Sequence, residues 1–368
     1  MSDTSQENYT TLRNDEWEHI ARLKDELTKQ RDSLANAYRR YESGDQSKEL
    51  DPARILTNLR ETLRRSIPDI ASSAPLTDFS IDDLIAGYWP TVRERKNTAT
   101  TGFSSLNEAL GGGLESGRLV CALGAPNCGK TTFVNQLADY VADSGRPVLY
   151  VTCEDTPAVL FAKTLARVGG IKYNAVLKGY PTEEERISEA LRKQAGRTST
   201  RTLRYIDAID GTLLLEQIRE KAEAHFSKFQ DAGPGVLVVD YLQALALAIK
   251  TRLQLKKDLR EVVTDVAKFL RAIAVSLGCT VVAITAQNRN NYKRGESGGM
   301  ASAKESGDIE YTADVMLSLV EDTDPRRVTP IDQIALNLYL DKNRQGQKGR
   351  AIALNFHPDR QQFTEVEK

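Results

Sequence analysis

The stretch GAPNCGKT at residues 124–131 indicates the fold of this chain, because it matches the pattern G-x-x-x-x-G-K-[ST] in full. It follows an apolar run at residues 119–123 and precedes a segment in which apolar residues recur at helical spacing. A strand, a glycine-rich turn and a helix in this order form a phosphate-binding loop, where backbone N–H groups and the helix N-terminus surround phosphate oxygens. The sequence therefore predicts that the chain binds a nucleoside triphosphate.

The residues of this loop have distinct expected roles. The Lys130 ammonium is expected to reach the β- and γ-phosphates, and the Thr131 hydroxyl to bind magnesium. The residues predicted to hold the nucleotide are consecutive in the chain: Gly124, Ala125, Pro126, Asn127, Cys128, Gly129, Lys130, Thr131 and Thr132. ATP and Mg²⁺ are the ligands that this set predicts.

Three polar residues that follow other apolar runs complete the predicted site. Asp240 ends the run at 236–239, where a carboxylate is placed to hold magnesium through water. Glu154 follows the run at 148–152 and is the expected general base; the alternative is a surface acid that caps the next helix. Gln287 follows a further run and is expected to sense the γ-phosphate, unless it is an ordinary loop amide.

From about residue 101 onward, unalternated runs rich in valine, leucine and isoleucine recur between helical segments. Such runs are typical of parallel strands that are buried on both faces. The five runs lie at residues 119–123, 148–152, 236–239, 280–284 and 315–319. Two further runs, 336–340 and 351–355, are separated by residues 342–350 and predict a C-terminal β-hairpin. The fold class is therefore α/β, with a mostly parallel central sheet.

The first hundred residues have a modest apolar content, and their pattern predicts a helical N-terminal region. Apolar residues at heptad spacing predict one helix over residues 13–43, which either packs on the rest of the chain or docks an oligomeric or protein partner. A capping box at Ser80 opens a further helix, and residues 96–101 are expected to form a linker. The predicted domains are residues 1–79, a linker region 80–100, and 101–368.

Composition limits the class of protein. The chain has 368 residues, with 50 Lys and Arg against 51 Asp and Glu, which argues against binding nucleic acid by bulk charge. No apolar run approaches the length of about 18 residues that a membrane span needs, and the polar N-terminus does not resemble a secretory signal. The four cysteines show no C-x-x-C pairing, so a zinc site or a disulfide framework is not expected. A cytoplasmic location is the prediction.

Two segments concentrate positive charge and are candidates for contact with single-stranded DNA. The candidate DNA-binding residues are Lys250, Arg252, Lys256 and Lys257, with Arg260 nearby, and Arg289, Lys293 and Arg294. Cations and a flexible, glycine-rich backbone can bind the phosphates of a nucleic acid regardless of its base sequence. The alternative for the first segment is a solvated helix face, because leucines lie among its charges.

Several stretches, taken together, resemble the RecA-type ATPase domain of DnaB-family replicative helicases, in helicase superfamily 4. The resembling stretches lie at residues 101–107, 111–114, 124–131, 148–154, 238–243, 305–314 and 342–346. The resemblance covers roughly residues 80–366 and implies a RecA-like core that assembles as a homohexamer with ATP between subunits. It also implies that Lys342 and Arg344 reach the γ-phosphate bound by the next subunit; without it, both are only charges in an exposed turn.

The chain departs from this family pattern in two places. Its N-terminal region is shorter than the helical domain that forms the family's collar and docks primase. Arg289 also arrives one residue early after Gln287. The resemblance implies an ATP-dependent helicase that translocates on single-stranded DNA. The alternative is a DNA-binding ATPase switch that assembles a ring and recruits a partner through helix 13–43, without processive unwinding.

Overall fold

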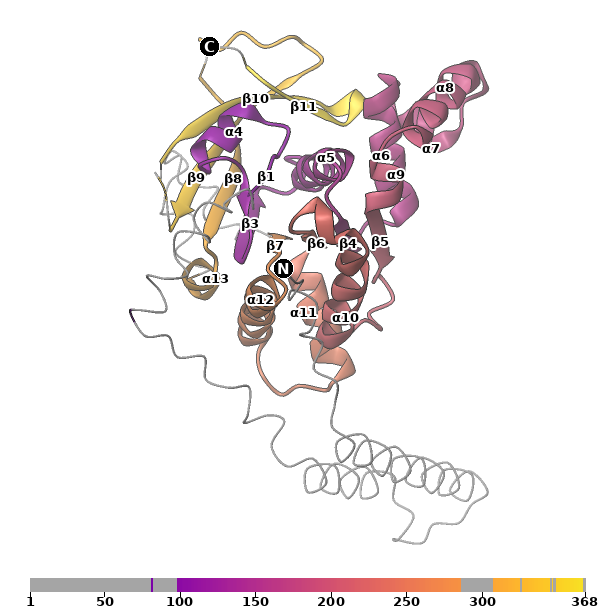
Figure 1. Cartoon of the computed structure of the whole chain (residues 1–368). Coiled ribbons are helices and arrows are strands. Elements are labelled where there is room, and N and C mark those ends of the chain that lie inside the picture. Colours follow the sequence, from indigo (N-terminus) through magenta and orange to yellow (C-terminus); the bar gives the residue numbers. More distant parts are fainter. Residues whose placement is uncertain are drawn as a thin grey trace, which may run out of the picture. The chain divides into compact units, whose positions relative to one another are not determined.

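Figure 1 shows the computed structural model of the chain. The structure describes residues 98–285, 307–324, 326–344, 346 and 349–366, together with Ile81. The expected helix 13–43, the rest of the expected helix that opens at Ser80, and the candidates Gln287, Arg289, Lys293 and Arg294 lie outside the described residues. The residues described from 98 onward belong to one compact unit, Trp89–Lys368.

The core is a nine-stranded sheet in the order β11-β10-β9-β8-β3-β7-β6-β4-β5. Its strands are β3 (Arg118–Gly124), β4 (Val148–Thr152), β5 (Leu203–Asp207), β6 (Val236–Asp240), β7 (Thr280–Ile284), β8 (Val315–Glu321), β9 (Ile334–Asn343), β10 (Ala351–His357) and β11 (Gln362–Glu365). The strands from β8 to β5 in this order are parallel, and β9, β10 and β11 are added antiparallel. This is the predicted α/β fold.

Helices cover both faces of the sheet (Figure 1). They are α4 (Ser104–Ala109), α5 (Lys130–Asp143), α6 (Pro157–Gly169), α7 (Tyr173–Lys178), α8 (Glu184–Ala195), α9 (Ser199–Thr202), α10 (Leu215–Phe226), α11 (Leu242–Arg252), α12 (Leu259–Ser276) and α13 (Gly307–Thr312). Alternate strand residues enter two separate apolar clusters, one shared with α5 and the other with α10, α11 and α12. Burial on both faces explains why the runs lack alternation. None of the described helices has the length and apolarity that crossing a bilayer requires.

The runs predicted as strands are all strands, and the C-terminal hairpin is confirmed by the antiparallel pairing of β9 with β10. Two expectations are wrong. Residues 98 and 99, expected within a linker, form β1 (Thr98–Ala99), which pairs with β2 (Leu114–Glu115) and buries the Ala99 side chain. Strand β9 continues to Asn343, so Lys342 lies in a strand and not in the predicted turn.

The C-terminal strand β11 is joined to the helix that follows the phosphate loop. The Gln136 side chain of α5 donates to the carbonyl oxygen of Phe363 at 2.9 Å and accepts from its N–H at 2.8 Å. The Phe363 ring is buried and stacks on Phe356 with centroids 4.5 Å apart. These contacts fix strand β11 beside the first two turns of α5.

Candidate nucleotide site

The loop 124–131 connects β3 to α5 at the carboxyl edge of the parallel strands, as its motif predicts. Gly129 is the N-cap of α5 and has φ +88°, a conformation that disfavours other residues. A Cβ atom there would also lie 2.9 Å from the Phe363 ring. Because the cap has no side chain, the first N–H groups of α5 remain for an anion.

A cavity of about 710 Å³ lies beside this loop. It brings together residues that are far apart in the sequence, and its lining residues are Pro126, Asn127, Gly129, Lys130, Thr131, Thr132, Glu154, Asp155, Lys163, Asp240, Tyr241, Ile284, Phe356, Pro358 and Gln361. The predicted phosphate ligand Lys130, magnesium ligands Thr131 and Asp240, and general base Glu154 therefore line one space. Parallel strands explain this, since their carboxyl ends meet at one edge.

The oxygen atoms of Thr131 and Asp240 are placed to share a divalent cation. The Thr131 hydroxyl donates to Asp240 Oδ1 at 3.4 Å, and the Tyr150 hydroxyl donates to Asp240 Oδ2 at 2.8 Å. Lys130 extends back over its own loop and donates to the carbonyl oxygens of Gly124 and Ala125 at 3.0 and 2.6 Å. A hydroxyl beside a carboxylate is the hard oxygen set that Mg²⁺ prefers, so these residues fit the ion.

The Asp240 side chain is buried, with 1% of its residue surface exposed. Burial raises the pKa of Asp240 to about 6, because removal from water disfavours the charged carboxylate. Hydrogen bonds from Tyr150 and Thr131 oppose this rise. The folded chain therefore holds a buried carboxylate whose negative charge a bound cation would stabilise by neutralising it.

The Asp240→Asn variant is expected to lose ATP hydrolysis and yet to unfold at a higher temperature without nucleotide. The pKa of Asp240 is about 6 in the folded chain against an ordinary value of 3.8, so stability falls as the pH rises between these two values, and the full cost is present above about pH 6. Asparagine removes this penalty, and we expect a gain of about 1–3 kcal/mol near pH 8 that shrinks towards pH 5. Thermal melts at both pH values measure it; a loss of stability at pH 8 would contradict the assignment.

Glu154 and Asp155 follow β4 and differ in their surroundings. The hydroxyl of Thr156 caps α6 by accepting the Val159 N–H at 3.3 Å, so neither of these two acids is the cap. Asp155 instead forms an ion pair with Lys163 at 2.6 Å. Glu154 lines the cavity and is not the helix cap, which removes the alternative considered for it.

Sequence reasoning missed one wall of the cavity. Phe356, Pro358 and Gln361, at and after the end of β10, also line the cavity. The Thr132 hydroxyl donates to Gln361 Oε1 at 2.7 Å, and Gln361 Nε2 donates to the Pro358 carbonyl oxygen at 2.7 Å. The stretch Pro358–Arg360 carries a turn signal, but β11 after it is too short for its pattern to be recognised.

Lys342 and Arg344 are not brought to this cavity. The Arg344 N–H donates to the Asp314 carbonyl oxygen at 3.1 Å, and the Asp314 N–H donates to the Leu119 carbonyl oxygen at 2.9 Å, near the start of β3. The loop 124–131 begins at the other end of β3, about 16 Å away at a rise of about 3.3 Å per residue. Both cations therefore lie at the opposite edge of the sheet from their own phosphate loop.

The first basic segment is only partly available to a ligand. Lys250 donates to the carbonyl oxygen of Lys257 within the loop between α11 and α12. Lys257 in turn forms an exposed ion pair with Asp265 at 2.6 Å. Arg252 and Lys256 are exposed. Of the four candidates in this segment, Arg252, Lys256 and Lys257 are exposed, and Lys257 would have to leave its ion pair to contact DNA.

The comparisons with known proteins identify relatives. Residues 99–365 match the family model described as "DnaB-like helicase C terminal domain". The chain is 25% identical over 322 residues to the replicative DNA helicase DnaC of Bacillus subtilis, covering 84% of this chain and 67% of that protein. It is 26% identical over 261 residues to the replicative DNA helicase DnaB of Haemophilus influenzae, covering 70% and 53%. The chain thus spans about half to two thirds of these relatives.

A solved structure of a DnaB-like replicative helicase, described with its interactions with primase, has the same fold. Its TM-score is 0.63 at 17% sequence identity, and the match covers 92% of this chain and 77% of that one. At this identity the likeness speaks for the fold only. It agrees with the RecA-like α/β architecture expected from the sequence.

Proposed function

The chain belongs to the family defined by the DnaB-like helicase C-terminal domain, and from this premise we propose that it is an ATP-driven motor that moves on single-stranded DNA and separates duplex. The active unit in this proposal is a homohexameric ring with ATP at each subunit interface. One observation carries it. The loop 124–131 and the pair Lys342 and Arg344 lie at opposite edges of one sheet. Two copies are needed to place both sets on one nucleotide.

Within one subunit, the described residues bind the nucleotide and prepare the attacking water. Lys130 turns from the carbonyl oxygens of its loop to the β- and γ-phosphates, and Thr131 and Asp240 hold the metal. Magnesium, when bound, neutralises charge on the phosphate oxygens. Glu154, in the same cavity, accepts the proton of the attacking water. Among the described residues that line the cavity, the cations are Lys130 and Lys163, and the proposal requires a further cation that reaches the γ-phosphate from the far side.

The neighbouring copy supplies that cation in this proposal. A guanidinium stabilises the charge that develops on the transferred phosphoryl group, so Arg344 couples hydrolysis to assembly. Lys342 adds a second positive charge beside it. Gln287 lies outside the described residues. Its proposed role as γ-phosphate sensor rests on its position in the sequence, after the strand β7.

DNA contact is proposed for the exposed cations at the end of α11 and in the loop after it, and for Arg289, Lys293 and Arg294, which lie outside the described residues. The Arg252→Ala/Lys256→Ala variant is expected to bind single strands more weakly. Each lost phosphate contact lowers the slope of log K against log salt by about 0.7, so the slope should fall by about 1.4. Fluorescence anisotropy over a salt series measures this.

Two exposed cations on α10 provide a matched control for this variant. Arg219→Ala/Lys221→Ala removes the same charge from a different surface, and its salt slope should equal that of the unmodified chain. Equal slopes for all three proteins would show that the loop after α11 does not contact the strand.

The hydrolysis rate with and without single-stranded DNA, followed by unwinding of a forked duplex, tests the function as a whole. A motor is expected to hydrolyse faster on the strand and to open the fork. A hydrolysis rate that single-stranded DNA does not change, together with no unwinding, would favour the ATPase switch that recruits a partner. Residues 13–43, which the sequence predicts to form a helix, are the proposed docking element for such a partner, and cytoplasmic action is part of the same proposal.

A further inference from the structure

Asp314 is a buried carboxylate at the amino edge of the sheet, with 1% of its surface exposed. Its Oδ2 accepts the Leu119 N–H at 3.0 Å and Arg271 Nε at 3.2 Å. Its Oδ1 lies 3.1 Å from a second Arg271 nitrogen, 3.4 Å from Arg344 and 3.8 Å from Arg118. Three guanidinium groups therefore share one negative charge.

The three arginines are not held equally. Arg271 binds both carboxylate oxygens, and together with the Leu119 N–H it satisfies Asp314 without Arg344. The Arg344 side chain is 41% exposed, against 17% for Arg118. Arg344 is thus the cation that can leave without stranding a buried carboxylate, which would be strongly unfavourable.

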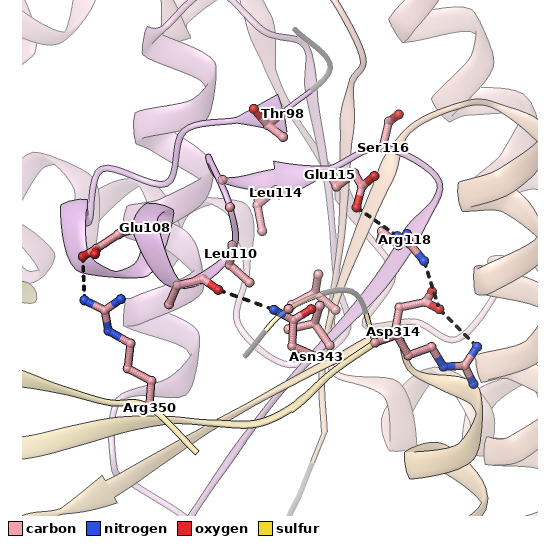
Figure 2. A pocket seen from close by; sticks show the side chains of 17 residues that line it. Thr98, Glu108, Leu110, Leu114, Glu115, Ser116, Arg118, Asp314, Asn343 and Arg350 are labelled. Atoms are coloured by element: carbon pink, nitrogen blue, oxygen red, sulfur yellow. Dashed lines mark hydrogen bonds and ion pairs between the residues drawn. The ribbon is translucent and has the colours of Figure 1, made fainter. Parts of the chain in front are cut away.

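Arg344 also borders an open space into which it can move. A cavity of about 530 Å³ is lined by Arg118, Asp314, Arg344 and Arg350, among others. Figure 2 shows Arg118 and Asp314 facing each other at its wall, with Arg350 across the cavity. The backbone hydrogen bond from the Arg344 N–H to the Asp314 carbonyl oxygen fixes the main chain from which the Arg344 side chain extends. The guanidinium can therefore change partner while its attachment point stays in place.

We propose that Asp314 is a positioning residue that docks Arg344 on its own subunit, and that Arg344 leaves this dock for nucleotide phosphates bound by a neighbouring copy. Arg271 sets the strength of the dock, because it competes with Arg344 for the same carboxylate oxygen. The α13 carbonyl oxygen of Tyr311, which accepts from Arg344 at 2.5 Å, adds to the docked state. This inference rests on the proposed role of Arg344 in the neighbouring site.

The Arg271→Gln variant tests the competition. Without its closest cation, Asp314 pairs more strongly with Arg344, and the docked state gains population. A partly exposed ion pair of this kind supports an expected fall in kcat of about 2- to 5-fold, with KM for ATP and ring assembly unchanged. The Arg271→Lys variant keeps a competing charge and should fall less. Lys268→Gln, one turn earlier on α12 and exposed, is the control and should match the unmodified chain.

The double variant separates positioning from a merely structural role. Asp314→Asn removes the charge that holds Arg344, so adding Arg271→Gln should cause no further fall in kcat, and the double variant should be faster than Arg271→Gln. A double variant that is slower than either single variant, or an Arg271→Gln variant with unchanged kcat, overturns the proposal. If Asp314→Asn does not fold, the single variants still test the dock. The proposal then requires kcat to fall from the unmodified chain to Arg271→Lys and further to Arg271→Gln.

The same measurements distinguish failure of this inference from failure of the proposed function. An Arg344→Ala variant that hydrolyses ATP normally refutes the neighbouring-site role, and the dock with it. An inactive Arg344→Ala variant beside an unaffected Arg271→Gln variant refutes the dock only.

Discussion

The Lys130→Ala variant is expected to lose ATP hydrolysis, with kcat at least about 100-fold lower, as for removal of one preorganised donor to a developing charge. The Lys130 ammonium lies over the loop, 3.0 Å from the Gly124 carbonyl oxygen and 2.6 Å from that of Ala125. Its replacement removes the charge that meets the β- and γ-phosphates and leaves the loop glycines in place. A phosphate-release assay at saturating ATP measures the loss.

The control for this variant is Lys221→Ala, which removes an exposed lysine on α10. It should hydrolyse ATP at the unmodified rate and unfold at the same temperature. If Lys130→Ala retained more than a tenth of the activity while Lys221→Ala behaved as expected, the loop 124–131 would not be the catalytic nucleotide site.

The Arg344→Ala variant is expected to bind ATP with unchanged Kd and to hydrolyse it about 10³-fold more slowly, the effect of losing an arginine supplied to a γ-phosphate. Binding should persist because Arg344 lies at the opposite edge of the sheet from its own phosphate loop. Fluorescent-nucleotide titration and single-turnover hydrolysis measure the two quantities separately.

Arg350→Ala is a matched control for Arg344→Ala. Arg350 lines the same 530 Å³ cavity but pairs with Glu108 at 2.5 Å, so its loss removes a local ion pair only. We expect near-normal kcat for this variant. Equal losses in both variants would indicate a general disturbance of the β9–β10 end of the sheet instead of a specific role for Arg344.

The part of the site at the carboxyl edge could be predicted from the sequence because its signals are local. The loop 124–131 has a fixed spacing, Asp240 directly follows one buried run, and Glu154 follows another after a single residue. Parallel strands then place these residues at one edge without further information. The structure brings them to a single cavity, as expected.

Other features could not be predicted because they depend on contacts between distant parts of the chain. Gln361 meets Thr132 across 229 positions, and nothing local to Gln361 indicates it. The convergence of Arg118 and Arg271 on Asp314 likewise requires the strand order, which sequence patterns do not provide. Strand β5 was missed because it lies at the sheet edge and is only partly buried.

Mixed rings test the central claim most directly, namely that one ATP site is built from two copies. Lys130→Ala and Arg344→Ala subunits are each expected to be inactive alone. When they are co-expressed and purified together, about one interface in four joins an intact loop 124–131 to an intact Arg344 from the neighbour. We predict that the mixed sample regains roughly a quarter of the unmodified hydrolysis rate. A mixed sample as inactive as its two components would contradict the account.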